Sequence, residues 1–146
     1  MSPLPNNIDN PIILQEGIMK IVTRDYSSEI IGKIHTLLYL LGSNAGSSGF
    51  FQASYAVYLV VEQPERLQYI TKYLYPAVAR EYDTNWRAVE RNIRHIANRA
   101  WHANPDLLRK ISFHRLFSRP TPTQFIALLA AYVGKPDGID MNDYVG

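Results

Sequence analysis

The sequence predicts an all-α domain that is built around a helix-turn-helix. Three observations support this fold class. Apolar residues recur at three- and four-residue spacing in several segments, which is the period of an amphipathic helix. Clusters of glycine, asparagine and proline separate these segments, as turns do. No two neighbouring segments alternate apolar and polar residues in the way that a pair of strands would.

Bulk properties narrow the function classes. The chain of 146 residues can bury the core of one domain, and its formal net charge is only +2. The absence of cysteine excludes disulfides, thiolate zinc sites and a thiol nucleophile. No apolar run approaches the roughly 18 residues of a membrane span, and the polar, proline-rich start does not resemble a secretion signal. We therefore expect a cytoplasmic protein with no membrane partner.

The first half of the chain predicts two helices. Residues 1–27 lack a regular period and are expected to form an arm of uncertain structure. A helix should then start at Ser27 and stop at Gly42. Its apolar stripe consists of Ile30, Ile31, Ile34, Leu37, Leu38 and Leu41. Residues 42–49 form a predicted loop, and residues 50–61 a strongly apolar helix at the centre of the core.

Prolines divide the next part. Pro64 is expected to open a helix that reaches Leu74, because proline is tolerated in a first turn. Pro76 should begin a short helix that ends near Tyr82. The next helix is expected to start at a cap formed by residues 83–84 and to end before Pro105.

The last part predicts two more helices, over residues 107–117 and 125–133, joined by a rigid connection at residues 120–123. Residues 134–146 are interpreted as a tail. One helical domain thus spans residues 28–133.

The segment at residues 83–102 is the most informative part of the chain. At helical spacing one face is apolar and consists of Trp86, Val89, Ile93, Ile96, Ala97 and Ala100. The other face is polar and consists of Arg87, Glu90, Arg91, Arg94, His95 and Asn98. Residues 84–102 hold four arginines and one acid, so positive charge is concentrated here. A short helix, a tight turn and a second helix with exposed arginines are the pattern of a DNA-binding helix-turn-helix.

Two interpretations of the polar face stay open from this pattern alone. Arginine can bond both acceptors of guanine in the major groove, and glutamate can accept from the amino group of cytosine. The alternative is an ordinary solvated helix face, in which Glu90 and Arg94 form an ion pair four residues apart.

Residues 70–101 resemble the DNA-binding effector domain of the stage zero sporulation protein A family, response regulators of endospore-forming bacteria. The motifs that carry the resemblance are Leu74-Tyr75-Pro76 with Ala79, Val89-Glu90-Arg91, Ile93-Arg94-His95 and Ala100-Trp101. Arg119-Pro120-Thr121, followed by Gln124-Phe125-Ile126-Ala127, resembles the last helix of that domain, and Glu29-Ile30-Ile31 resembles its first. The resemblance covers residues 28–133 in one collinear order.

The resemblance implies a six-helix all-α fold around the helix-turn-helix and a transcription regulator that binds double-stranded DNA sequence-specifically. It places base contacts at Glu90, Arg91, Arg94 and His95. We expect phosphate contacts from Arg87, Asn98, Lys72 and Arg80. The resemblance also implies contact with RNA polymerase, and a homodimer or tandem copies on DNA. No cofactor and no metal are expected.

The chain departs from the family pattern at three places. Fewer than thirty residues precede the first predicted helix, so no receiver domain is expected. The loop at residues 46–50 and the pair Ser54-Tyr55 lack charges that the family carries, so the phosphate or polymerase contacts of those charges are in question. At Trp86-Arg87-Ala88 an arginine has moved by one position, which indicates a changed DNA site preference.

The sequence gives little indication of catalysis, metal binding or single-strand binding. No paired carboxylates, triad or metal cluster indicates an enzyme. His95 and His102 lie seven residues apart without a carboxylate at metal-binding spacing, His35 is expected to pack in its helix, and His114 to lie on the surface. Five tyrosines are expected to pack within and between helices rather than to stack on single-stranded nucleic acid, and these are Tyr55, Tyr58, Tyr69, Tyr73 and Tyr75.

One alternative function stays open beside DNA recognition. A protein-interaction module or antagonist could retain the fold after the loss of DNA binding. The altered loop at residues 46–50 and the expected lack of a receiver domain motivate this alternative.

Overall fold

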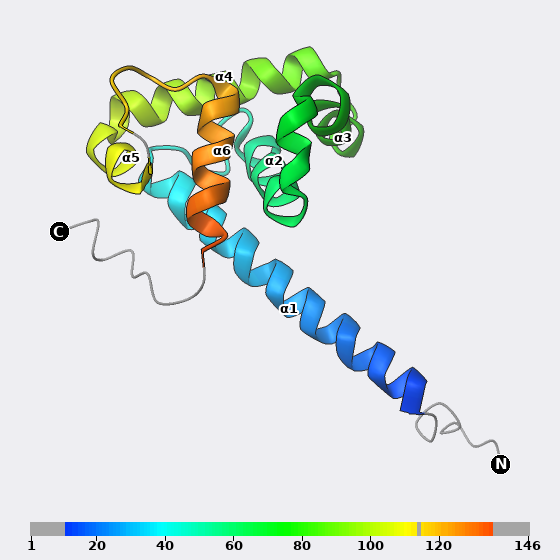
Figure 1. The fold of residues 1–146 in the computed structure, drawn as a ribbon. Coiled ribbons are helices and arrows are strands. Elements are labelled where there is room, and N and C mark those ends of the chain that lie inside the picture. Colours follow the sequence, from blue (N-terminus) through cyan, green and yellow to red (C-terminus); the bar gives the residue numbers. More distant parts are fainter. Residues whose placement is uncertain (1–10, 114, 136–146) are drawn as a thin grey trace.

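The computed structural model describes residues 11–113 and 115–135, with side chains from residue 26 onward. This part of the chain contains six α-helices and no strand, so the predicted fold class is confirmed. In chain order the elements are α1 (Pro11–Leu40), α2 (Phe50–Glu62), the 3-10 helix η2 (Pro64–Tyr69), the π-helix η3 (Ile70–Leu74), α3 (Tyr75–Glu81), α4 (Trp86–Ala103), α5 (Pro105–Ile111) and α6 (Pro122–Val133). Figure 1 shows α4 lying across one end of the domain, above α6 and the C-terminal part of α1.

The core forms around α2, which packs against α1, α4 and α6. Each surrounding helix contributes fully buried side chains to it, such as Leu38 from α1, Ile93 from α4 and Phe125 from α6. Burial of each such side chain is worth about 1.5–3 kcal/mol. The apolar spacing that predicted these helices therefore also marks the sides on which they meet.

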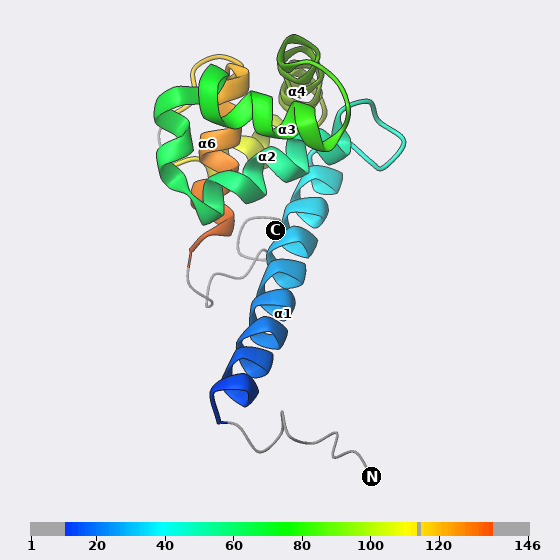
Figure 2. The same cartoon turned by 90° about the vertical axis from the view of Figure 1, so that its right-hand side faces the viewer.

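The first helix is longer than predicted. α1 begins at Pro11 and not at Ser27, so the helix extends back through much of the expected arm. Pro11 occupies a first turn, where its missing N–H costs nothing, and no further proline interrupts the segment. Figures 1 and 2 both show the N-terminal half of α1 extending away from the other helices. Further along α1, the Ser27 hydroxyl forms a hydrogen bond of 2.9 Å with the Tyr58 hydroxyl of α2.

Two other predicted helices were wrong in form or extent. The segment that begins at Pro64 is a 3-10 helix followed by a π-helix, and not one regular α-helix. No side chain of η2 is fully buried, and of its residues Leu67 packs against the core, so little packing holds that part to the α-helical period. α5 ends at Ile111 and does not reach Phe117, because Ser112 is extended and Phe117 finds no core to enter, with 82% of its surface exposed.

The last helix starts earlier than predicted, at Pro122. Thr121 caps it: the Thr121 hydroxyl accepts a hydrogen bond from the Gln124 N–H, and the Gln124 side chain accepts one from the Thr121 N–H. This reciprocal capping box is the signal that the sequence interpretation overlooked in its rigid connection.

The predicted tyrosine packing holds for three of the five residues. Tyr75 is buried, and Tyr55 and Tyr58 pack against the core. Tyr69 and Tyr73, in contrast, are 56% and 47% exposed. They belong to the irregular segment η2–η3, which has few core contacts.

Of the four histidines, His35 and His114 had expectations about where they lie. His35 is half-buried and packs its ring against Phe50 and Phe51, as the expectation for a packed helix residue requires. The expectation for His114, and the tail aspartates Asp137, Asp140 and Asp143, lie outside the described residues.

Candidate nucleic-acid interface

Helix α4 has the two faces that its sequence predicts. Five of its apolar side chains are buried in the core, namely Val89, Ile93, Ile96, Ala97 and Ala100, and Ala88 joins them. Trp86, predicted for the same face, is only half-buried. On the opposite face Arg87, Arg91, Arg94 and His95 are exposed, and Glu90 and Asn98 are half-buried. The helix thus presents a continuous polar surface on a rigid, packed backbone.

The turn between α3 and α4 is built from two caps. The Thr84 N–H donates to the Ala79 carbonyl at 2.9 Å and the Asp83 N–H to the Arg80 carbonyl at 3.4 Å, the pattern of a Schellman motif at the end of α3. Asp83 takes the left-handed conformation of this motif, with φ of 52°. The turn therefore reverses the chain tightly without a glycine.

The cap of α4 is Asn85 and not the predicted pair at residues 83–84. The Asn85 side-chain oxygen accepts a hydrogen bond from the Ala88 N–H at 2.9 Å. Asp83 cannot cap α4 because it closes α3 instead. The two helices with their four-residue connection form the predicted helix-turn-helix.

Glu90 and Arg94 bond to each other on the polar face. The Arg94 guanidinium donates to the Glu90 carboxylate at 2.9 Å, with the side chains 51% and 35% exposed. This is the ion pair of the alternative interpretation, and at such exposure solvent screens most of its strength. The pair holds the Arg94 guanidinium in one direction, which is compatible with either interpretation.

The other charged groups of this face have no such partner. Among residues 26–113 and 115–135, whose side chains the structure describes, no carboxylate pairs with Arg91 or His95. Arg87 lies over the ring of Trp86, with 5.4 Å from its guanidinium carbon to the ring centre. Arg91 and His95 are therefore open to an anionic or hydrogen-bonding ligand.

The remaining predicted phosphate contacts lie on the elements before α4. Arg80 is exposed in the last turn of α3, beside the turn. Lys72 is exposed in η3, and its ammonium lies 5.2 Å from the centre of the Tyr73 ring. The Asn98 side chain lines a cleft with Arg94 and residues 119–122 that has a volume of about 170 Å³.

Neighbouring elements hold α4 in place through contacts that the sequence did not reveal. The Arg99 guanidinium donates to the Gly42 carbonyl at 2.6 Å, and the Asn104 amide donates to the Leu40 carbonyl at 3.0 Å. Both bonds satisfy carbonyls at the end of α1. Arg99, one of the four arginines counted on this segment, therefore serves the fold and does not belong to the polar face.

A second anchor lies between α4 and the start of α2. Gly49 caps α2 with φ of 88°, and a Cβ at this position would lie 2.8 Å from the Asn92 Cβ and 2.9 Å from the Asn92 carbonyl oxygen. The Asn92 amide also donates to the Gln52 side chain at 3.0 Å. The glycine allows this close approach of α2 to α4.

Tyr75 lies buried beneath the polar face. Burial raises the pKa of Tyr75, and the nearby Glu90 carboxylate raises it further, while Thr123 and Arg94 lower it. The phenol therefore stays neutral and adds no negative charge beneath the arginines.

The pair Ser54-Tyr55, which lacks the charges carried by the family, has a structural role in this protein. Ser54 is buried, and the Tyr55 ring packs against Tyr82.

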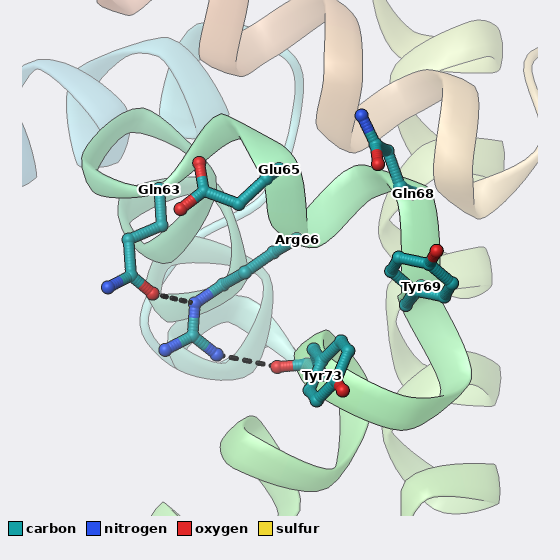
Figure 3. A pocket seen from close by; sticks show the side chains of 6 residues that line it. All are labelled: Gln63, Glu65, Arg66, Gln68, Tyr69 and Tyr73. Atoms are coloured by element: carbon teal, nitrogen blue, oxygen red, sulfur yellow. Dashed lines mark hydrogen bonds between the residues drawn. The ribbon is translucent and has the colours of Figure 1, made fainter.

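A separate cavity of about 250 Å³ lies along η2 and η3 (Figure 3). Its walls are formed by Gln63, Glu65, Arg66, Gln68, Tyr69 and Tyr73. The Arg66 guanidinium donates to the Gln63 side chain at 2.8 Å and to the Tyr73 carbonyl, so two of its nitrogens are engaged within the chain.

The described residues offer neither a cluster of metal ligands nor a membrane-spanning helix. Among those that the structure describes, no three histidine or carboxylate groups come together in a way that could hold a metal ion. None of the helices in this part of the chain is both long and apolar enough to span a membrane.

The fold and the arginine-bearing face of α4 define a helix-turn-helix domain of the kind found in transcription regulators. The chain belongs to the family described as sporulation initiation factor Spo0A C terminal, whose model matches residues 34–133. The resemblance carried by the motifs of the sequence is therefore confirmed. The family is one of DNA-binding regulatory domains and not of enzymes.

Proposed function

We propose that this protein binds double-stranded DNA sequence-specifically, with α4 in the major groove. The observation that carries the proposal is the polar face of α4, which holds exposed arginines on a helix whose other face is buried in the core. Such a helix fits the major groove, and the short helix before it then crosses the DNA backbone.

Base recognition falls to the middle of this face. Arg91 and Arg94 each offer a planar pair of donors to the two acceptors of guanine. Glu90, which bonds to Arg94, can accept from a neighbouring cytosine amino group. His95 lies beside them and completes the base-contacting set.

Phosphate positioning falls to the residues around this centre. Arg87 and Arg80 flank the turn, Lys72 precedes α3, and Asn98 offers an uncharged amide. Such contacts set the register of the helix on the duplex, and their cationic members give binding its dependence on salt.

The test is selection of a preferred duplex from random sequence, followed by binding measurements on variants. We expect Arg91→Ala and Arg94→Ala each to weaken binding to the selected duplex by roughly 5- to 150-fold, equivalent to 1–3 kcal/mol, and to relax base preference. Lys33→Ala is the control, because it removes one exposed positive charge from α1, where Lys33 pairs with Glu29. Unchanged affinity and base preference in both arginine variants would contradict the proposal.

A second candidate function is protein binding without DNA recognition. The observation that favours it is the pair of exposed rings Tyr69 and Tyr73, in edge contact at 5.5 Å beside the cavity of η2 and η3. Aromatic side chains are enriched at protein interfaces. RNA polymerase is the partner to test, because the resemblance in sequence implies contact with it.

Paired variants separate the two functions. If protein binding is the main function, Tyr69→Ala with Tyr73→Ala abolishes capture of purified RNA polymerase, and the wild-type chain binds no duplex at low salt. If DNA recognition is the function, the same tyrosine variant keeps its duplex affinity and base preference. Sedimentation of the protein with one-site and two-site duplexes tests the expected homodimer or tandem copies.

A further inference from the structure

The cleft beside α4 joins the polar face to a distant segment of the chain. Arg94 and Asn98 form one wall, and Arg119 with residues 120–122 forms the other. Figure 1 shows the start of α6 meeting α4 near its middle, after the preceding loop has run back along α4 from α5. Arg119 therefore adds a guanidinium to the edge of the polar face, although it lies 25 residues after Arg94.

Arg119 carries a charge that the described chain leaves without a partner. It is exposed, and no carboxylate among the side chains that the structure describes, at residues 26–113 and 115–135, pairs with it. No carboxylate lines the described cleft, and Glu90 is bonded to Arg94. Two guanidinium groups beside one small cleft repel each other unless an anion lies between or next to them.

The backbone that presents Arg119 is held firmly. Pro120 and Pro122 are buried, and the capping box of Thr121 and Gln124 locks the turn between them. Pro120 also restricts Arg119, the residue before it, to extended backbone angles, and this limits the directions in which the Arg119 side chain can leave the backbone. Because this backbone is already fixed, binding has to order only the Arg119 side chain, which lowers the entropic cost of the contact.

The position of Arg119 beside α4 would bring it close to the phosphates at the edge of the DNA major groove. The major groove is about 12 Å wide, so a helix that enters it brings the elements at its edges to the phosphates on either side. We infer that Arg119, in the loop just before α6, binds a DNA backbone phosphate beside α4, with Asn98 next to it in the same cleft. This inference rests on the proposed function, and it adds a fixed phosphate contact from outside the helix-turn-helix.

Salt titration with the selected duplex tests the inference. We expect Arg119→Gln to reduce the slope of log K against log salt by about 0.9, the amount for one lost phosphate contact. Affinity for selected and scrambled duplexes should fall by the same factor, and Arg119→Lys should keep the wild-type slope. Arg115→Gln is the matched control, because Arg115 belongs to the same loop, stacks on Phe117 and does not line the cleft.

A second measurement identifies the phosphate. A set of duplexes, each with one uncharged methylphosphonate, should contain a position that weakens wild-type binding and leaves Arg119→Gln unaffected. Thermal unfolding checks that each variant stays folded. An unchanged slope in Arg119→Gln, an equal loss in Arg115→Gln, or a changed base preference would each overturn the inference while wild-type DNA binding stands. Absence of duplex binding by the wild-type protein would instead overturn the proposed function itself.

Discussion

Single residues set the distances between the helices that support the polar face. Gly49 lets the start of α2 approach α4 at Asn92, and His35 fills the space beside Phe50 and Phe51. Neither residue touches the proposed DNA contacts. Each nevertheless has a measurable consequence for stability.

Gly49→Ala should lower the free energy of unfolding by roughly 2–5 kcal/mol. Left-handed angles cost a non-glycine residue about 1–2 kcal/mol, and overpacking against backbone costs a further 1–3 kcal/mol. Urea unfolding measures the change. Gly32→Ala is the control: Gly32 is exposed in α1 with no atom within 4 Å of an added Cβ. It should stabilise the protein slightly, since alanine is the better helix former. Equal effects of the two substitutions would refute the close approach at Asn92.

Acid should weaken the fold partly through His35. Burial lowers the pKa of His35 below its ordinary value of 6.5. The folded chain then binds this proton less readily than the unfolded chain, so the contribution is complete above pH 6.5 and is lost as pH falls from 6.5 through the folded pKa. We expect the free energy of unfolding to drop over that interval, and less so in His35→Gln. Identical pH profiles would show that His35 is not the source.

At the scale of the element, the helix-turn-helix depends on its caps and on one ion pair. Asn85 fixes the first turn of α4, where Arg87 lies, and Glu90 orients Arg94 one turn further on. Local hydrogen bonds thus arrange the proposed contacts before any DNA is bound.

Asn85→Ala should destabilise the protein by about 0.5–2 kcal/mol, because the Ala88 N–H loses its cap. Asn85→Ser or Asn85→Asp should restore most of the loss, since both side chains can accept the same bond. Chemical denaturation gives the values. If alanine, serine and aspartate variants were equally stable, Asn85 would have no capping role.

A double-mutant cycle separates the two roles of Glu90 and Arg94. In the free protein their coupling should be no more than about 0.5 kcal/mol, as expected for an exposed pair four residues apart. In DNA binding the coupling should be larger, since loss of Glu90 also releases the guanidinium that contacts the base. Unfolding curves and duplex affinities of Glu90→Ala, Arg94→Ala and the double variant supply both cycles. Equal coupling in both would indicate a solvated ion pair without a reading role.

At the scale of the whole molecule, the net charge of +2 is a poor guide to function. The fold brings Arg119, which lies just before α6, to the same cleft as Arg94 of α4, whereas Arg99 bonds to the Gly42 carbonyl just after α1. Where the charges lie, and not their sum, determines the field that DNA would meet.

The salt dependence of DNA binding should show how many of these cations contact phosphate. Removal of the three proposed cationic phosphate contacts in Lys72→Gln, Arg80→Gln and Arg87→Gln together should lower the slope of log K against log salt by about 2.7, at 0.9 for each cation. Base preference should stay unchanged, because these residues are assigned to the backbone. A triple variant that keeps the wild-type slope would remove all three assignments.

The parts of the fold that sequence predicted well are those with strong local patterns. The apolar stripes of α1, α2 and α4 repeat at the helical period, and they are the faces that the core buries. Prediction failed over η2 and η3, because these segments bury few side chains and so lack a clear apolar period. It also failed at the turn, because Asp83 ends α3 and Asn85 begins α4 within three residues, and both residue types are typical caps.

The division of α4 into a buried face and a polar face follows from the sequence alone, because helical periodicity depends only on neighbouring residues. Its motifs also identified the family, which the match over residues 34–133 established. Which arginines remain available for DNA depends on how the helices pack. Arg99 bonds to a carbonyl 57 residues away, and Arg119 arrives beside Arg94 from across a loop. Such meetings depend on how the helices pack, which no local spacing encodes.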